Sequence, residues 1–307
     1  MTDISAKDAT QNRGLFKPFL KWAGGKGQLL SVIGTKYPFD GYITKYAEPF
    51  VGGGAVLFDI LSQYELSEIY ISDRNEALIN TYKAVRDKAE ELITLLAEYQ
   101  EAYLPLSAED RKVYYLQRRE EFNSHLGKLG KEASARVAAL LVFLNKTCFN
   151  GLYRVNRKGF LNVPMGAYKN PLICDEEKLS LLSERLKHVE IVCGDYGEAD
   201  SFIDVHTFVY FDPPYRPLTR TAEFTAYTAG AFDDAEQEKL AEFCRKCDKK
   251  GARFLLSNAD PKNADPDDNF FDDLYTGFKI ERVEAVRMIN SKGSRRGKIA
   301  ELLISNY

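Results

Sequence analysis

The chain has 307 residues, of which 45% are hydrophobic and 12% are aromatic, and its formal net charge is −3. This length and apolar content suit one large α/β domain or a core with an inserted piece, and they exclude a small module or a disordered chain. The sequence contains no run of about 18 apolar residues and begins with no apolar stretch, so we expect no membrane span, no signal peptide and a cytoplasmic location.

The net charge conceals an uneven distribution along the sequence. Residues 111–169 carry a net charge of +9, residues 282–298 carry +5 and residues 13–26 carry +4, whereas the rest of the chain carries −21. Basic tracts on an acidic body indicate a polyanionic partner bound at a defined surface. Considered alone, the charges fit ordinary solvated helix faces equally well.

The five cysteines do not predict a disulfide framework or a metal centre. Cys244 and Cys247 form a single C-x-x-C pair in a charged, helix-like stretch. A structural zinc site needs four nitrogen or sulfur ligands, and all three histidines lie far from this pair in the sequence. We therefore expect reduced structural thiols and no metal.

The first part of the chain alternates between helices and strands. After a polar tail, the expected elements are a helix over 26–37, a strand over 43–47, a helix over 55–64, a strand over 68–72 that ends at Asp73, and a long helical stretch over 75–101. A strand, a glycine-rich turn, a helix and a second strand ending in an acid are typical of the start of a doubly wound α/β sheet.

This alternation stops and then resumes. Residues 107–146 predict two helices, and residues 149–170 predict a basic hairpin with its turn at Asn156-Arg157-Lys158-Gly159. Further strands are expected over 189–193, 207–211, 252–257, 278–284 and 299–304, the last two forming an antiparallel edge hairpin with a basic loop over 285–298. We predict a flexible tail (1–12), a core (13–78 and 172–307) and an inserted domain (79–171).

A glycine-rich loop over residues 49–54 follows one predicted strand and opens a helix, so its backbone can pass close to a ligand. Leu57 stands where a dinucleotide fingerprint needs its third glycine, and Glu48 before the loop disfavours a pyrophosphate. Asp73, at the end of the next strand, can accept hydrogen bonds from both hydroxyls of a ribose. Together these residues predict a nucleoside whose other end is neutral or zwitterionic.

The segment from Trp22 to Lys26 superficially resembles a phosphate-binding loop. Leu20 occupies the position of the first required glycine, and Gly27 replaces the serine or threonine, which argues against an ATP site. Trp22 and Lys26 remain candidates for ligand contacts. The alternative for Trp22 is a core aromatic residue.

The most specific motif is Asp212-Pro213-Pro214-Tyr215, which follows an apolar strand at the carboxyl end where α/β sheets bind ligands. Two prolines stiffen the backbone and remove two N–H donors. The Asp212 carboxylate and the Pro213 carbonyl can accept both hydrogens of a planar amino group while Tyr215 stacks on its ring. Holding both hydrogens out of the ring plane localises the nitrogen lone pair toward an electrophile. Alone, the motif also fits a proline turn capped by Asp212.

In this order the motifs resemble the Dam family of DNA adenine methyltransferases, and they look most similar to the methyltransferases of DpnII-type restriction systems. The matching stretches are KPFLKWAGGK (17–26), AEPFVGGGA (47–55), ISDRN (71–75), NGLYRVNRKGFLNVPMGAYKNP (150–171), CGDY (193–196), FDPPYRPL (211–218), LLSN (255–258) and RGKIAELLISNY (296–307). The resemblance implies a Rossmann-like α/β methyltransferase core with an inserted target-recognition domain built of helices and a hairpin.

The resemblance also implies S-adenosyl-L-methionine as the cofactor. The residues that match its binding site are Trp22, Lys26, Pro49, Phe50, Gly52, Gly54, Asp73, Asp195, Tyr196 and Asp212. Tyr196 stands where many relatives carry phenylalanine. The catalytic residues implied are Asp212, Pro213, Pro214 and Tyr215, which hold the amino group of an adenine, and Asp212 or water accepts a proton late in the reaction.

Relatives flip the target adenine out of the duplex, so double-stranded DNA is the implied partner. Residues that match DNA contacts are Phe149 as a wedge in the base stack, Asn150 for the orphaned base, Leu152, Arg154 and Pro164 for base reading, Lys21 for the first guanine, and Asn156, Arg157, Lys158 and the loop 292–298 for phosphates. The stretches NGLYRVN and NVPMG match relatives that methylate GATC, which predicts that site and a nucleoid-associated enzyme.

Two other functions fit parts of the sequence. One is a methyltransferase for another amine, such as a cytosine amino group, RNA or a protein glutamine, although variants of the four-residue motif that begin with Ser or Asn are commoner there. The other is a DNA-binding relative without turnover, which the intact motif disfavours. The sequence does not determine whether a restriction endonuclease accompanies the enzyme.

Overall fold

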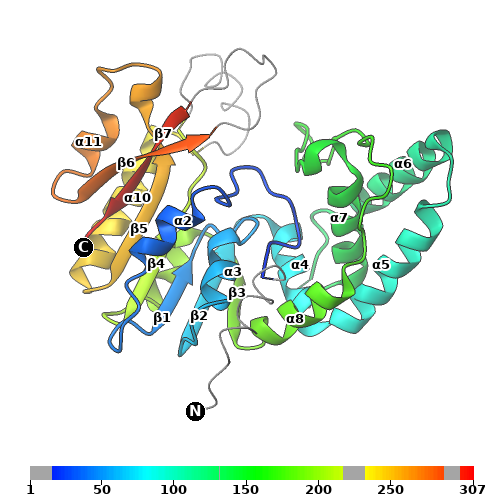
Figure 1. Ribbon diagram of the computed structural model, residues 1–307, viewed down its shortest axis with the longest axis horizontal. Helices are drawn as coiled ribbons and strands as arrows, with labels where there is room; N and C mark the ends of the chain where they lie inside the picture. Colours follow the sequence, from blue (N-terminus) through cyan, green and yellow to red (C-terminus); the bar gives the residue numbers. More distant parts are fainter. Residues whose placement is uncertain (1–15, 131, 217–231, 287–297) are drawn as a thin grey trace. The chain divides into compact units, whose positions relative to one another are not determined.

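The computed structural model describes residues 16–130, 132–216, 232–286 and 298–307 (Figure 1). Within these limits the chain forms two compact units, the first made of residues 16–26, 51–65 and 72–194 and the second of residues 27–50, 66–71 and 195–307. The predicted tail and residues 287–297 of the predicted basic loop lie outside the described residues. The proposed division into a core and an inserted domain stays a prediction.

Seven strands form one mixed sheet in the order β3-β2-β1-β4-β5-β7-β6. The strands are β1 (Lys45–Glu48), β2 (Glu68–Asp73), β3 (Val189–Cys193), β4 (Thr207–Phe211), β5 (Arg253–Ala259), β6 (Lys279–Val286) and β7 (Lys298–Ser305). β1 is parallel to β2 and β4, and β4 is parallel to β5, whereas β7 is antiparallel to β5 and β6. The predicted mixed sheet with a C-terminal antiparallel hairpin is therefore confirmed.

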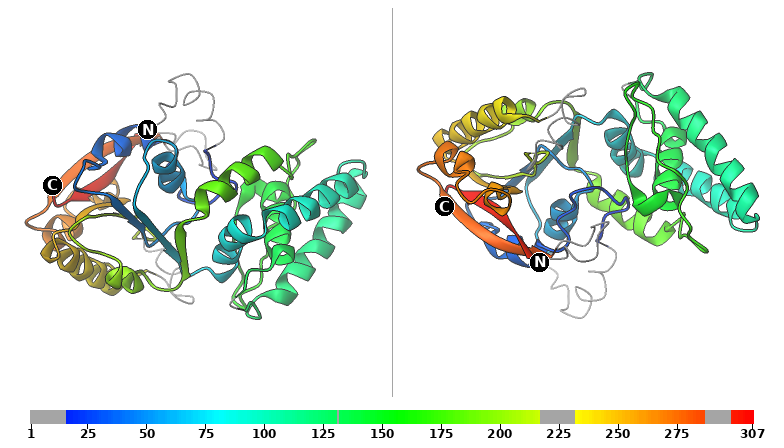
Figure 2. Two further views of the ribbon diagram at one scale, coloured as in Figure 1. Left: turned by 90° about the horizontal axis from the view of Figure 1, so that it is seen from below. Right: turned by 90° about the horizontal axis from the view of Figure 1, so that it is seen from above.

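The strand order reverses between β1 and β4, the switch point at which doubly wound sheets bind ligands beyond the carboxyl ends of their strands. All five residues of β4 are buried, as are the five central residues of β5. Such continuous apolar runs are typical of strands covered on both faces. In agreement, α10 (Asp234–Lys249) and the short α2 (Leu30–Ile33) lie on opposite faces of this part of the sheet (Figure 2).

The first unit is built around a helical bundle (Figure 1). Its helices are α4 (Glu76–Asp87), α5 (Ala89–Tyr103), α6 (Ala108–His125), α7 (Ala135–Thr147) and α8 (Glu176–Leu186). Helix α7 packs against α4, α5 and α6, and eleven of its thirteen residues are buried. A helix that is apolar on nearly every side belongs in the interior of a bundle, and the helices predicted over 107–146 are confirmed as α6 and α7.

Other elements differ from the sequence prediction. The stretch predicted as one long helix is two helices, because Lys88 leaves the helical region with φ −138° and ψ 37°. The helix predicted over 26–37 is reduced to α2 and a 3-10 turn over Gly34–Lys36, since Gly34 and Pro38 both disfavour its continuation. The short helices α3 (Ala55–Leu61) and α11 (Phe270–Leu274) complete the α-helices of the described residues. Neither α8 nor α11 was predicted.

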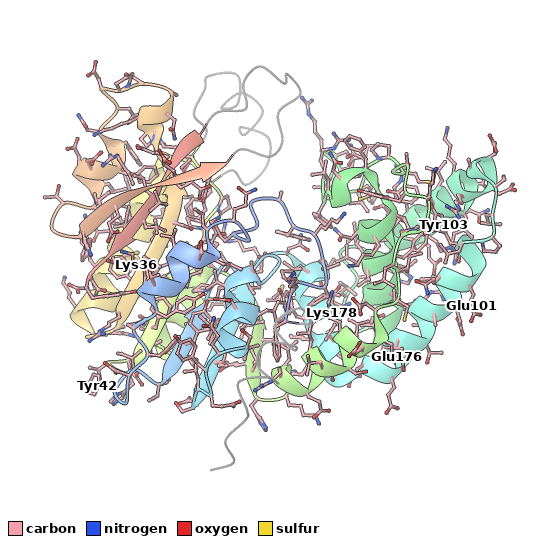
Figure 3. The ribbon with its side chains drawn as sticks, viewed as in Figure 1. Lys36, Tyr42, Glu101, Tyr103, Glu176 and Lys178 are labelled. Carbon is pink, nitrogen blue, oxygen red and sulfur yellow. The ribbon has the colours of Figure 1, made fainter. Side chains whose placement is uncertain are left out.

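The predicted basic hairpin is present, although it pairs through isolated bridges and not through long strands. Cys148 pairs with Met165, and Val155 pairs with Leu161, both antiparallel. Helix α6 holds the returning strand, because the Tyr115 hydroxyl donates to the carbonyl of Val163 at 2.8 Å. At the end of α5, the Tyr103 hydroxyl donates to Sδ of Met165 at 3.3 Å (Figure 3). The helical bundle therefore supports the hairpin along its length.

The C-terminal hairpin extends further than predicted. β6 continues to Val286 and β7 begins at Lys298, so three residues assigned to the basic loop belong to the strands. On the same sheet edge, the Lys36 ammonium pairs with Glu281 of β6 at 2.6 Å (Figure 3).

Two findings concern membranes and metals. Throughout the described ranges, every helix is too short or too polar to span a bilayer. In the same ranges no group of three or more His, Cys, Asp or Glu side chains is placed to hold a metal ion. Cys244 and Cys247 are free thiols buried on α10, where burial raises the pKa of Cys247 to about 12.

Candidate functional site

The glycine-rich loop connects β1 to α3 by a path that only glycine can follow. Gly52 and Gly54 have φ angles of +47° and +72°. A Cβ atom on Gly54 would lie 2.5 Å from the Tyr82 hydroxyl, and one on Gly52 would lie 3.0 Å from Cδ1 of Trp22. At Gly52 and Gly53 the loop backbone therefore lies against Trp22 with no side chain in between, as a close approach to a ligand requires.

Asp73 holds this loop from the end of β2. Its Oδ2 accepts a hydrogen bond from the Gly52 N–H at 3.1 Å, and its Oδ1 accepts one from the Asn75 N–H at 2.8 Å. Burial raises the pKa of the carboxyl, and these two hydrogen bonds oppose the shift. Each oxygen retains a further lone pair that can accept from a ribose hydroxyl. The loop and the acid thus fit the nucleoside end of S-adenosylmethionine.

Trp22 and Lys26 lie in the same unit as this loop. Trp22 is half-buried, so it is not a residue of the sealed core. Lys26 is only 5% exposed, and its ammonium donates to the Gly24 carbonyl at 2.9 Å. This ammonium is therefore partly engaged by its own segment.

The other residues matched to the cofactor lie in the second unit. The rings of Phe50 and Tyr196 are 5.4 Å apart, and Phe232 packs edge-on against Phe50 at 5.7 Å. Asp195 caps a 3-10 turn over Tyr196–Ser201, its Oδ1 accepting from the Gly197 N–H at 3.0 Å. Pro49, which precedes Phe50 in the chain, is buried. These contacts form a mostly buried apolar cluster, and Asp195 precedes Tyr196 in the chain.

Asp212 follows β4 and is held by the neighbouring strand β5. Its Oδ1 accepts a hydrogen bond from the Ser257 hydroxyl at 3.1 Å, and the Ser257 oxygen lies 3.0 Å from the Tyr210 hydroxyl. Because Ser257 donates to the carboxylate, Tyr210 is the donor to Ser257. This chain of hydroxyls fixes one carboxylate oxygen.

The two proline carbonyls that follow are not equivalent. The Pro214 carbonyl accepts from Nε2 of Gln237 at 3.2 Å, and Oε1 of Gln237 accepts from Nδ2 of Asn258 at 3.2 Å. Gln237 and Asn258 are both fully buried. Among the described residues nothing donates to the Pro213 carbonyl. The Pro213 carbonyl, which the sequence analysis predicted to accept a hydrogen of the amino group, therefore remains available as an acceptor among the described residues.

Tyr215 ends the motif with its hydroxyl anchored. The hydroxyl donates to Oε2 of Glu301 on β7 at 2.6 Å. Burial, reinforced by the charges of Asp212 and Glu301, raises the pKa of Tyr215 far above its ordinary value. The next residue, Arg216, forms ion pairs with Asp234 at 2.7 Å and with Asp268 at 2.6 Å. The hydroxyl is thus protonated and the ring is held at its outer end, an arrangement that suits stacking on a planar group.

Lys21, in the first unit, is fixed through its backbone. Its N–H donates to Oδ1 of Asn145 at 2.8 Å, and its carbonyl accepts from Nδ2 of the same residue at 2.8 Å. Its ammonium lies over the ring of Tyr168 at 5.0 Å from the ring centre. The side chain remains exposed, so its charge is available to a partner.

The basic hairpin begins with two exposed residues after α7. Phe149 is 52% exposed, and Asn150 has a left-handed backbone with φ 56°. Further along, the Arg154 guanidinium donates from Nε to Oδ1 of Asn162 at 2.9 Å. Leu152 is half-buried, whereas Arg154 and Pro164 are exposed. The hairpin therefore presents both an apolar ring and an oriented guanidinium to solvent.

The side chain of Asn156 stabilises the hairpin turn. Its Oδ1 accepts from the backbone N–H groups of Lys158 at 2.9 Å and Phe160 at 3.1 Å. The side chains of Arg157 and Lys158 are exposed at this turn. Of the predicted phosphate loop over 292–298, all but Lys298 lies outside the described residues.

Residues 22–289 match the family described as D12 class N6 adenine-specific DNA methyltransferases. The chain belongs to this family. It is also similar to the type II methyltransferase M.MjaIII of Methanocaldococcus jannaschii, with 51% identity over 95% of this chain and 99% of that protein. The type II methyltransferase M1.LlaDCHI of Lactococcus lactis subsp. cremoris is 38% identical over 97% and 98%, and a DNA adenine methylase of Vibrio cholerae is 34% identical over 94% and 95%.

The resemblance to DNA adenine methyltransferases is thereby confirmed, and the chain is an adenine-specific DNA methyltransferase. Base flipping and the GATC site stay predictions. The sheet described above is the Rossmann-like fold of a D12 methyltransferase. Enzymes of this family act on DNA and in general use S-adenosylmethionine. The individual cofactor, catalytic and DNA contacts stay predictions.

Sequence reasoning missed the residues that support the Asp212 motif in this D12 methyltransferase. They are Ser257, Gln237, Asn258, Glu301 and Arg216. Four of the five lie inside matched stretches, which could have marked them, although no local pattern indicated which partner each would contact. Gln237 lies in a charged helix and carries no such signal.

Proposed function

We propose that this enzyme methylates the exocyclic amino group of adenine within GATC sites of duplex DNA, after flipping the base from the helix. The observation that carries the proposal is the corner at residues 212–214. It combines a carboxylate fixed by Ser257 with a Pro213 carbonyl that has no donor among the described residues. These two acceptors match the two hydrogens of an amino group.

The chemistry requires the amino nitrogen to become a nucleophile, because its lone pair is normally delocalised into the adenine ring. Asp212 and the Pro213 carbonyl bind one hydrogen each and localise that lone pair. S-adenosylmethionine, when bound, supplies an electrophilic methyl group. Asp212 or water then accepts the proton that methylation makes acidic. Alignment and electrostatic support of the amine are the main contributions of the protein.

We assign cofactor binding to residues that combine shape, charge and apolar surface. They are Trp22, Lys26, Pro49, Phe50, Gly52, Gly54, Asp73, Asp195, Tyr196 and Asp212. In this assignment Asp73 binds the ribose, and the backbone of Asp195 and Tyr196 receives the adenine of the cofactor. The carboxylates in this set also complement a positively charged sulfonium.

Base flipping needs a group that fills the vacated place in the stack. Unstacking and unpairing cost a few kcal/mol, and an aromatic ring that is already exposed can offset part of this cost without unfolding anything. Phe149 is such a ring, being 52% exposed. Asn150 follows it and can hydrogen-bond the orphaned base. We assign these two residues the wedge and pairing roles.

Sequence reading is assigned to Lys21, Leu152, Arg154 and Pro164. The Arg154 guanidinium is oriented by Asn162, so it presents a fixed pair of donors, and the guanine edge in the major groove offers two acceptors at matching spacing. Arg157 and Lys158, exposed at the turn, suit phosphate contacts that position the duplex without reading it.

The proposal is tested in cells that express the chain and lack other GATC methylation. Their genomic DNA should resist a nuclease that is blocked by adenine methylation at GATC. Expression of the Asp212→Ala variant is the control and should leave the DNA sensitive. Sensitive DNA from the unaltered chain, together with methyladenine found only in another sequence, would refute GATC as the site. Label transferred from the cofactor only to RNA or protein would refute the DNA reaction itself.

Replacing Arg154 with alanine should relax the choice of one base pair. The loss of one bidentate contact should cost about 1–3 kcal/mol of discrimination at that position and little elsewhere. Methylation rates on the GATC duplex and on its single-substitution variants measure this discrimination. Arg157→Ala is the matched control and should slow methylation of all duplexes alike. A uniform loss for Arg154→Ala would make Arg154 a phosphate contact.

The type II names of two relatives describe those proteins. For this chain, the cytoplasmic, nucleoid-associated location stays a prediction.

A further inference from the structure

Tyr153 lies in the basic hairpin between Leu152 and Arg154, the two neighbours to which base reading is assigned. Its ring stacks on Trp22, with ring centres 5.0 Å apart and ring planes inclined by 24°. Tyr153 is half-buried, and burial raises the pKa of its hydroxyl. The hairpin thus sends one aromatic side chain inward from the segment that carries its base-reading residues.

The Trp22–Tyr153 pair is surrounded by residues to which cofactor binding is assigned. A Cβ atom on Gly52 or Gly53 would lie 3.0 Å from Trp22, so the tryptophan rests directly on the glycine loop. The Tyr153 hydroxyl interacts with the side chain of Asn75 and with the charge of Asp73. Asp73 in turn binds the N–H groups of Gly52 and Asn75. All of these residues lie in the first unit.

The position of Tyr153 affects the direction of the neighbouring side chain. Leu152, just before Tyr153, has an extended backbone with φ −75° and ψ 143°, and the Arg154 carbonyl accepts from the Asn162 N–H at 3.0 Å across the hairpin. Successive side chains of an extended segment point to opposite sides. Arg154 is exposed whereas Tyr153 is half-buried, so a fixed inward Tyr153 helps to fix the outward direction of Arg154.

We propose that Tyr153 is a positioning residue that couples cofactor binding to recognition of the DNA sequence. This inference rests on the proposed roles of Trp22 and Asp73 in binding the cofactor and of Leu152 and Arg154 in reading bases. A cofactor that orders the glycine loop also orders Trp22, and the stacked ring passes that order to the hairpin. The second ligand then has less left to order, so each ligand strengthens binding of the other by the same factor.

The chain has one tryptophan, so its intrinsic tryptophan fluorescence reports on Trp22 itself. The experiment measures the affinity of S-adenosylhomocysteine, a non-reacting probe, with and without a GATC duplex, and repeats both with a duplex of shuffled sequence. The ratio of the two affinities is the coupling factor. We expect the GATC duplex to tighten probe binding more than the shuffled duplex does.

Tyr153→Leu removes the stacked ring, and Tyr153→Phe keeps it and serves as the matched control. An aromatic pair of this kind contributes enough for the coupling factor to fall by about 2- to 10-fold in Tyr153→Leu. Tyr153→Phe should retain most of the coupling. Thermal melting of both variants checks that the fold is intact, and a merely structural role would lower the affinity without changing the ratio.

Three results would overturn the inference. One is an unaltered protein that binds both ligands with no coupling between them. Another is a Tyr153→Leu variant whose coupling factor equals that of the unaltered protein. The third is an equal loss of coupling in Tyr153→Phe, which would remove the ring stack as its cause. A protein that methylates GATC but gives any of these results keeps its proposed function, whereas failure to bind probe or duplex would remove both proposals.

Discussion

Replacing Asp212 with alanine is expected to lower the rate of methyl transfer on the order of 100- to 10,000-fold, because the amino group of the target adenine would then lose one of its two proposed acceptors and one of the two proposed late acceptors of its proton. The Pro213 carbonyl alone binds one hydrogen and cannot hold the other out of the ring plane. Single-turnover transfer of labelled methyl groups to a GATC duplex measures this rate.

Folding should survive the Asp212→Ala substitution, because the carboxylate is only partly buried and sits at the end of β4 rather than in the core. Thermal melting and cofactor affinity are therefore measured beside the rate. A variant that melts normally, binds cofactor and still transfers methyl groups at the original rate would contradict the assigned role.

Ser257→Ala gives a graded comparison for the same carboxylate. It removes the hydrogen bond that fixes one Asp212 oxygen but leaves the charge in place. A hydrogen bond to a charged group contributes about 1.5–3 kcal/mol, so this variant should lie between the unaltered enzyme and Asp212→Ala. Equal rates for the two variants would mean that orientation, and not the carboxylate itself, is what the reaction needs.

Much of the sheet could be predicted from the sequence, because buried parallel strands read as short apolar runs bounded by turn residues. β3 and β4 have the predicted bounds. The acids that follow them, Asp195 and Asp212, are the proposed ligand contacts. The glycine loop was predictable for a similar reason. Its close approach to Trp22 depends on a local backbone path, and glycine marks such a path in the sequence.

What could not be predicted depends on contacts between distant residues. No glycine or proline marks the break at Lys88, so periodicity alone favoured one long helix. The partner of Tyr215 lies 86 residues away, and the residue that donates to Pro214 comes from a helix whose pattern resembles any charged surface helix. The contact between Tyr215 and Glu301 exists because β7 lies beside β5, and no local sequence pattern indicates that strand order.

Asp73→Ala is expected to weaken cofactor binding by about 10- to 100-fold, since hydrogen bonds to a charged group contribute about 1.5–3 kcal/mol. The substitution removes the proposed ribose acceptor and also releases the Gly52 N–H, so the glycine loop loses its anchor. Calorimetric titration with S-adenosylhomocysteine measures the effect. A change below twofold would exclude Asp73 from the cofactor site.

The ionisation of Asp73 provides the matched test. Burial raises the pKa of this carboxyl above its ordinary value, so its protonation on acidification begins at a higher pH than that of an exposed aspartate. The proposed ribose contact is strongest with the charged form, and cofactor affinity should therefore fall as the pH drops through this raised pKa. Asp73→Asn keeps the shape but cannot ionise, so its weaker affinity should lose this pH dependence. Since burial opposes the charge, the free protein should conversely gain stability from this group as the pH falls, and Asp73→Asn should lack that gain as well. If cofactor affinity falls on acidification while the free energy of unfolding rises, the cofactor-binding role of the carboxylate is separated from its effect on stability. The reason is that bound cofactor favours the charged carboxylate, whereas burial in the protein disfavours it.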